Sequence, residues 1–251
     1  MTNSTLKNPS LQFTTAALLL AGLALPAQAR DEEIARGVNP KDNISKVDLI
    51  YKRDNMTGDA SVQSLSFKYD QALNADWGVN LELPTVKYSS PLLNEAGLGD
   101  VQFRIRKVTN FEQGALILGA EAVAPTASHD ALGLGKWQLN PVVGFVYSFT
   151  PMTFLYMGYK HLYSVGGDSA RPDINMSQPR MLLAYTSPKG WWVLGDLKYT
   201  RDHNSRNDLL DCELEVGQML THNMALSARI GAPRLDTTRT FGFSLNGRYI
   251  F

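Results

Sequence analysis

The last twelve residues constrain the fold more than any other part of the chain. Residues 240–251 read TFGFSLNGRYIF, and alternate side chains of an extended strand point to opposite faces. Positions 241, 243, 245, 247, 249 and 251 share a face that is mostly aromatic and aliphatic. The other face is small or polar, with Gly242, Ser244, Asn246 and Arg248. A strand with an apolar outer face and a polar inner face suits the wall of a barrel in lipid.

The N-terminus has the pattern of a secretory signal. Lys7 is the only charged residue in the first 29, an apolar stretch covers about residues 16–26, and Ala27-Gln28-Ala29 is a small-residue cleavage motif. The apolar stretch is shorter than the roughly 20 residues that a spanning helix needs. We therefore expect residues 1–29 to be a cleaved signal peptide and residues 30–45 to be a polar, periplasmic lead-in. The alternative is a retained N-terminal anchor.

Composition narrows the classes that remain. The chain has 24 basic and 24 acidic residues, which argues against a nucleic-acid partner and against a polybasic membrane-surface protein. The single cysteine, Cys212, excludes an intramolecular disulfide scaffold. The sequence lacks the histidine–carboxylate spacing that is typical of a metal site. The adjacent pair His129-Asp130 supplies too few ligands to form such a site by itself. We expect no metal and no cofactor.

From residue 46 onward the apolar period is two, which predicts strands. Twelve strands are expected, over residues 46–54, 61–70, 78–89, 100–109, 115–125, 137–149, 153–165, 176–186, 191–201, 211–220, 224–231 and 240–251. Short turns alternate with longer polar loops, such as residues 90–99, 126–136 and 166–175; the short connection at residues 55–60 is the exception. This alternation predicts an all-β, antiparallel, up-and-down transmembrane barrel over residues 46–251, with short periplasmic turns and longer outer loops. A soluble periplasmic barrel is the alternative.

Charged residues alternate with apolar ones along these strands, which places them on the face toward the lumen. The predicted lumen-lining residues are Lys68, Asp70, Glu82, Arg104, Arg106, Glu121, Lys160, Arg180, Asp196, Lys198, Glu213, Glu215, Arg229 and Arg248. Segregated charges would create a field across a pore, whereas interleaved charges would pair and fill the interior. Pairing is the simpler expectation, because unpaired charges in a narrow lumen are costly. Cys212 falls on the lipid-facing side of its strand.

Two glycine-rich stretches resemble a known family. Ala96-Gly97-Leu98-Gly99-Asp100-Val101 opens one predicted strand; Val123-Ala124-Pro125-Thr126 ends another and precedes Leu132-Gly133-Leu134-Gly135-Lys136. Together they resemble the outer-membrane family of meta-pathway phenol-degradation proteins, over about residues 83–149, although Ala127 replaces the glycine usual after Pro-Thr. The resemblance implies passive transport of a small, apolar or aromatic solute and no catalytic residues.

The same glycines have a structural explanation. Gly97, Gly99, Gly133 and Gly135, with Asp100, are expected to shape two loops at the barrel mouth by allowing positive φ and tight turns. At the other end of the chain, Tyr249 and the terminal Phe251 resemble the signal by which the barrel-assembly machinery recognises outer-membrane barrels.

These features favour an outer-membrane channel for a small solute, in contact with membrane lipid and lipopolysaccharide. The charged lumen favours polar solutes and the resemblance implies apolar ones.

One alternative is a lipid-modifying enzyme with His161 as the base and Ser164 or Ser148 as its partner. No G-x-S-x-G motif is present, so we do not expect an enzyme. Another is a structural barrel that binds partners through the loop at residues 166–175.

Overall fold

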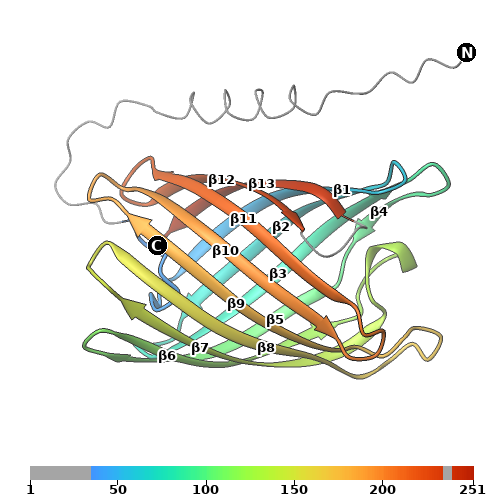
Figure 1. Ribbon diagram of the computed structural model, residues 1–251, viewed down its shortest axis with the longest axis horizontal. Coiled ribbons are helices and arrows are strands. Elements are labelled where there is room, and N and C mark those ends of the chain that lie inside the picture. Colours follow the sequence, from blue (N-terminus) through green and yellow to red (C-terminus); the bar gives the residue numbers. More distant parts are fainter. Residues whose placement is uncertain (1–34, 234–238) are drawn as a thin grey trace, which may run out of the picture. The chain divides into compact units, whose positions relative to one another are not determined.

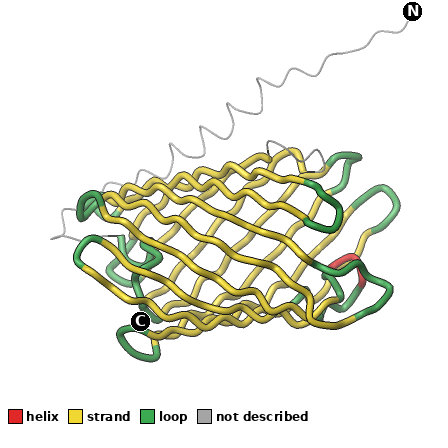
Figure 2. Tube along the Cα trace, turned by 60° about the horizontal axis from the view of Figure 1, so that its bottom comes forward, coloured by secondary structure: helices red, strands yellow, loops and turns green. Residues whose placement is uncertain are grey.

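The computed structural model describes residues 35–233 and 239–251, so the predicted signal peptide lies outside the described residues. The described chain forms thirteen strands and one 3₁₀ helix (Figures 1 and 2). The elements are β1 (Lys46–Met56), β2 (Ser61–Ala72), β3 (Trp77–Ser89), β4 (Asn94–Leu98), β5 (Val101–Phe111), β6 (Gly114–Ala124), η1 (Asp130–Leu132), β7 (Lys136–Ser148), β8 (Thr153–Gly167), β9 (Asn175–Thr186), β10 (Trp191–Asp202), β11 (Asp208–Met219), β12 (Met224–Pro233) and β13 (Arg239–Ile250).

The sheet closes on itself. β1 pairs antiparallel with β13, from Lys46↔Ile250 onward, and each remaining wall strand pairs with its neighbour in sequence. β4 is an extra strand that continues the line of β5: β5 pairs with the first half of β3, and β4 pairs with the second half. Twelve tilted strands therefore form a closed barrel (Figure 2), which confirms the predicted all-β, up-and-down fold.

The predicted strand boundaries agree with the structure to within three residues, and the differences occur at both the turn side and the loop side. Residues 90–99 were predicted to be a long loop, which is wrong, because Asn94–Leu98 pairs with Thr85–Ser89 and leaves only four residues for the turn. β11 likewise begins at Asp208, three residues earlier than predicted. In the described part of the chain, no helix is long and apolar enough to cross a membrane.

Large apolar side chains cover the outer face of the barrel. Phe103 is 46% exposed, Leu183 52% and Leu245 47%. Phe103 and Leu245 alternate with polar neighbours that point inward, whereas the inward neighbours of Leu183 are the buried, apolar Leu182 and Ala184. Apolar residues on neighbouring strands continue this surface: Leu65, Phe67, Leu83, Ile105, Leu118, Val143, Met157, Met181, Leu197 and Leu214. A continuous apolar surface of this kind is suited to contact with lipid rather than water.

The two ends of the barrel differ. The turn side carries the short connections at residues 73–76, 112–113, 149–152, 187–190 and 220–223, and the loop side carries the others. Inside the turn side lies a buried cluster, which we call the inner apolar layer: Ala35, Val108, Ala115, Ile117, Val146, Phe154, Leu182, Ala184, Trp192, Leu194, Met219, Ala225 and Ile250. Gly217 makes room for the Trp192 indole, because a Cβ there would lie 2.0 Å from the ring.

Candidate functional site

The N-terminal segment (residues 35–45) packs into the turn side of the lumen (Figure 1, blue, near the C-terminus). Ala35 is 2% exposed within the inner apolar layer, and Val38 and Ile44 pack against that layer. This part of the predicted lead-in is therefore folded against the interior of the barrel. It narrows the lumen at the end opposite the outer loops.

Two arginines of the wall hold this segment by its backbone. Arg106 donates through Nη1 to the carbonyl of Pro40 at 3.1 Å and through Nη2 to the carbonyl of Asp42 at 3.0 Å. Arg248 donates through Nη1 to the carbonyl of Gly37 at 2.8 Å. Hydrogen bonds from charged donors are among the stronger ones in proteins. The segment is therefore docked by polar contacts as well as by apolar packing.

Gly37 is the residue of the N-terminal segment whose backbone conformation and surroundings least tolerate a side chain. Its φ is +71°, a region that other residues rarely adopt, and a Cβ there would lie 2.7 Å from Ile44 Cδ1. Its N–H donates to Asp42 Oδ2 at 3.2 Å. Burial raises the pKa of Asp42 above its usual value, although this hydrogen bond and nearby lysines act in the opposite direction.

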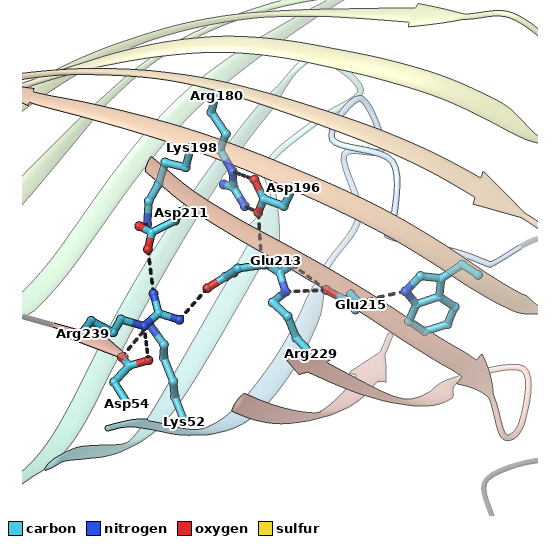
Figure 3. A network of polar contacts seen from close by, with 11 residues as sticks. Lys52, Asp54, Arg180, Asp196, Lys198, Asp211, Glu213, Glu215, Arg229 and Arg239 are labelled. Atoms are coloured by element: carbon cyan, nitrogen blue, oxygen red, sulfur yellow. Dashed lines mark hydrogen bonds and ion pairs between the residues drawn. The ribbon is translucent and has the colours of Figure 1, made fainter. Parts of the chain in front are cut away.

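A charge network lines one side of the lumen and is shown in Figure 3. Its labelled members are Lys52, Asp54, Arg180, Asp196, Lys198, Asp211, Glu213, Glu215, Arg229 and Arg239. Arg229 is central: its guanidinium lies 3.0 Å from Asp196, 3.0 Å from Glu213 and 2.5 Å from Glu215. The network thus ties β12 to β10 and β11.

Arg239 is a second centre of the charge network. It lies 2.9 Å from Asp54, 2.8 Å from Asp211 and 3.3 Å from Glu213. Asp211 also pairs with Lys198 at 3.1 Å. Because Arg239 is on β13 and its partners are on β1 and β11, the network spans strands that are not all neighbours.

A smaller cluster surrounds Glu121 on the opposite wall. Glu121 is 2% exposed and binds both Arg104 and Lys160, with 3.0 Å between Lys160 Nζ and Glu121 Oε1. Asn140, which is fully buried, donates to the same oxygen at 3.2 Å. All hydrogen-bonding directions of this carboxylate are used within the protein.

The structure places the predicted lumen residues in pairs. Beyond the charge network and the Glu121 cluster, Lys68 lies 3.7 Å from Glu82 and Arg248 lies 2.7 Å from Asp48. Arg106 differs, because its hydrogen bonds go to carbonyl groups of the N-terminal segment. Asp70 is a further exception, because its buried Oδ2 has no hydrogen-bond partner within the described part of the chain. The other predicted charges are interleaved and paired.

Sequence reasoning missed five charged members of these clusters: Asp48, Lys52, Asp54, Asp211 and Arg239. Asp211 shares a strand face with the predicted Glu213 and Glu215. Asp48, Lys52 and Asp54 share one face of β1, so alternation alone could have found these four. Arg239 carried no such signal, because it was assigned to the loop before the last strand.

Between the outer loops and the charged walls lies a cavity of about 560 Å³. Side chains of β1–β3 and β5–β9 line it, and residues 131–134 of the β6–β7 connection cover it on the loop side. Asp100 fixes this cover, because its carboxylate accepts the N–H groups of Ala127 at 3.2 Å and Leu134 at 2.7 Å. Thr126 donates to the carbonyl of Gly99 at 2.9 Å.

The mouth-loop glycines have two separate roles. Gly135 has a φ of +68°, as predicted for a turn glycine. The prediction of positive φ is wrong for Gly97, Gly99 and Gly133, which allow close approach instead. A Cβ at Gly133, for example, would lie 2.5 Å from Asp100 Oδ1, so the loop could not reach its anchor.

The residues considered for catalysis are not brought together as predicted. His161 stacks between Tyr159 and Tyr163, and Ser164 donates to Asp173 at 3.4 Å rather than to a histidine. A different pair forms on the outer face near the loop side: Ser177 Oγ lies 2.8 Å from His203 Nε2.

Three further residues singled out in the sequence, Cys212, Tyr249 and Phe251, have clear positions. Cys212 is a free thiol, partly buried, and Tyr249 and Phe251 form an edge-to-face pair with 5.3 Å between ring centres. No group of three or more metal-binding side chains occurs among residues 35–233 and 239–251. Recognition of Tyr249 and Phe251 by an assembly machinery stays a prediction.

Comparison with known proteins places the fold. No family model matches the sequence, and no curated protein matches it. The COG4313 outer membrane channel from Pseudomonas putida F1 matches with a TM-score of 0.69 and 14% identity, over 85% of this chain and 100% of that one. The KdgM porin matches with a TM-score of 0.62 and 9% identity, over 82% and 99%. The CymD monoaromatic hydrocarbon channel matches with a TM-score of 0.53 and 9% identity, over 88% and 94%. The chain therefore has the fold of outer-membrane channel barrels, and its resemblance to the phenol-degradation family stays a prediction.

Proposed function

We propose that this protein is a channel of the bacterial outer membrane through which a small solute passes without energy input. One observation carries the proposal: a closed barrel with an apolar outer surface encloses a cavity of about 560 Å³. Export with cleavage near Ala29, insertion through recognition of Tyr249 and Phe251, and contact with membrane lipid and lipopolysaccharide belong to the same proposal.

The proposed route has an outer and an inner part. A solute enters from the loop side past the cover at residues 131–134 and reaches the cavity. On the turn side it meets the inner apolar layer and the N-terminal segment, so release requires that segment to move. Apolar or aromatic solutes are supported by the likeness to a monoaromatic hydrocarbon channel, and polar solutes by the charged lumen.

The test is the conductance of the refolded mature protein, residues 30–251, in a planar bilayer. We expect discrete current steps, interrupted by long closures because the N-terminal segment obstructs the path. Uptake of small neutral solutes into protein-containing liposomes, followed by swelling, provides a second readout. A folded barrel that gives neither current nor swelling would contradict the proposal.

A second candidate function, hydrolysis of lipid esters, is supported by the pair Ser177–His203. Its 2.8 Å contact lies on the lipid-facing side of the barrel, where a membrane ester could reach it, and a hydroxyl next to an imidazole base is the minimal arrangement for nucleophilic attack. The Ser177 hydroxyl also lies 2.9 Å from the Tyr159 hydroxyl.

For this candidate we expect fatty-acid release from phospholipid vesicles by the wild type and none by Ser177→Ala. Ser164→Ala is the matched control, because Ser164 contacts Asp173 and not a histidine. Absence of release by the wild type removes the candidate and leaves the channel proposal intact.

A further inference from the structure

The cavity of the lumen differs in chemistry from the rest of the interior. Its wall contains the hydroxyls of Ser64 and Ser66, the amides of Gln102 and Gln138, and a set of apolar side chains. The apolar members are Val62, Pro84, Val86, Val123, Leu132, Leu162 and the neighbouring Ala131 and Leu134. Its volume of about 560 Å³ falls within the range of small-molecule pockets, about 300–1,000 Å³.

The charges that reach this cavity are already neutralised by the protein. Glu121 is held by Arg104, Lys160 and Asn140, and Lys52 lies 3.0 Å from Asp54. An ionic solute would lose its hydration and would find no unpaired counterion unless it broke one of these pairs. Charged solutes are therefore disfavoured in the cavity.

The neutral polar groups, in contrast, are available to a ligand. Across the described ranges 35–233 and 239–251, neither the hydroxyls of Ser64 and Ser66 nor the amide of Gln102 has a hydrogen-bond partner in the protein. Ser64 and Ser66 are two residues apart on β2 and share one face. Ser66 pairs in register with Pro84, and Gln102 pairs with Glu82 on the same strand β3. Free hydroxyls and a free amide thus flank the apolar surface of Pro84.

We propose that this cavity binds small uncharged solutes that carry hydroxyl groups on an apolar skeleton. The hydroxyls of such a solute exchange hydrogen bonds with Ser64, Ser66 and Gln102, and its skeleton packs on Pro84 and the valines. This inference rests on the proposed channel and names the class of its solute. It also explains how a lumen rich in charge can accept a partly apolar molecule, since the charges are engaged with one another.

The test uses three probes that share a cyclohexane ring and differ in the charge of their substituents: cyclohexanediol, cyclohexanedicarboxylate and cyclohexanediamine. Binding to the detergent-solubilised mature protein is measured by saturation-transfer NMR, which does not require passage through the barrel. We expect the diol to bind saturably and the dianion and dication to bind at least about tenfold more weakly.

A double substitution tests whether the diol binds at the serine hydroxyls of the cavity. Ser64→Ala combined with Ser66→Ala removes two hydroxyls and is expected to weaken diol binding about tenfold. Thr85→Val is the matched control, because Thr85 lies on the outer face of β3 and its hydroxyl donates to Leu65 instead of reaching the cavity. Circular dichroism melting shows whether each variant is folded.

The outcomes separate this inference from the channel proposal. Equal binding of the charged probes, or unchanged diol binding in the folded double variant, overturns the inference even where conductance is observed. Diol binding by a barrel that conducts nothing retains the ligand class and rejects the channel. Saturable diol binding that the double variant weakens and Thr85→Val preserves supports the inference.

Discussion

Arg229→Met is expected to lower the free energy of unfolding by about 3 kcal/mol, because removing one partner of a buried ion pair leaves the others uncompensated. Glu215 loses the largest part of its stabilisation, because its one remaining partner is the indole N–H of Trp192 at 3.0 Å. Asp196 and Glu213 keep Arg180 and Arg239, which limits the loss. Denaturant-induced unfolding of the refolded barrel, followed by tryptophan fluorescence, measures the change.

Two comparisons make this expectation specific. Arg201→Met removes a pair with Asp208 in which both side chains are about one-third exposed, 35% and 37%, and exposed pairs contribute only about 0–1 kcal/mol. Adding Glu215→Gln to Arg229→Met removes the charge that has lost its ionic partner and should restore most of the lost stability. An equal effect of Arg229→Met and Arg201→Met would mean that the charge network is hydrated and contributes little.

Deleting residues 30–42 is expected to raise the mean current at least about tenfold, because a change of 1.4 kcal/mol already shifts an open–closed equilibrium tenfold. The deletion removes three hydrogen bonds from Arg106 and Arg248, and hydrogen bonds to charged groups contribute about 1.5–3 kcal/mol each. It retains Asn43, whose amide donates to the carbonyls of Asn74 and Trp77 and supports the neighbouring turn. Planar-bilayer recording of the two proteins side by side measures the difference.

Gly37→Val provides an independent route to the same state. The substitution forces a branched residue into a φ of +71° and places its Cβ against Ile44. The N-terminal segment should therefore dissociate from the lumen while the wall of the barrel, including the β1–β13 seam, stays intact. We expect a current between those of the wild type and the deletion. If neither change raises the current, the inner apolar layer rather than the N-terminal segment closes the lumen.

The strands were predictable because their signal is local. Alternation with a period of two marks the wall strands, although the inner apolar layer makes both faces apolar at the turn-side ends of strands such as β6 and β9. β4 was not predicted, because Asn94-Glu95-Ala96-Gly97-Leu98 has no clear apolar face and forms a strand only by pairing with the end of β3.

The arrangement of the lumen was less predictable, because it depends on contacts between distant residues. Alternation indicated that Glu213 and Arg229 point inward, but not that they meet. The docking of the N-terminal segment gave even less signal, since Arg106 binds backbone carbonyls at Pro40 and Asp42, and any residue supplies a carbonyl. The Ser177–His203 pair joins a strand to a loop and likewise has no local pattern.

The pairing of β1 with β13 has a consequence for biogenesis. The seam joins Lys46 to Ile250, so it forms only after all the strands from β1 to β13 have been synthesised. The N-terminal segment is tethered directly to β1, and its docking partner Arg248 is on β13, while Arg106 is on β5. Its binding site is therefore completed by the same event that seals the wall. Seam closure and occupation of the lumen are coupled steps, so a nascent barrel that has not closed at β1 and β13 also lacks its internal obstruction.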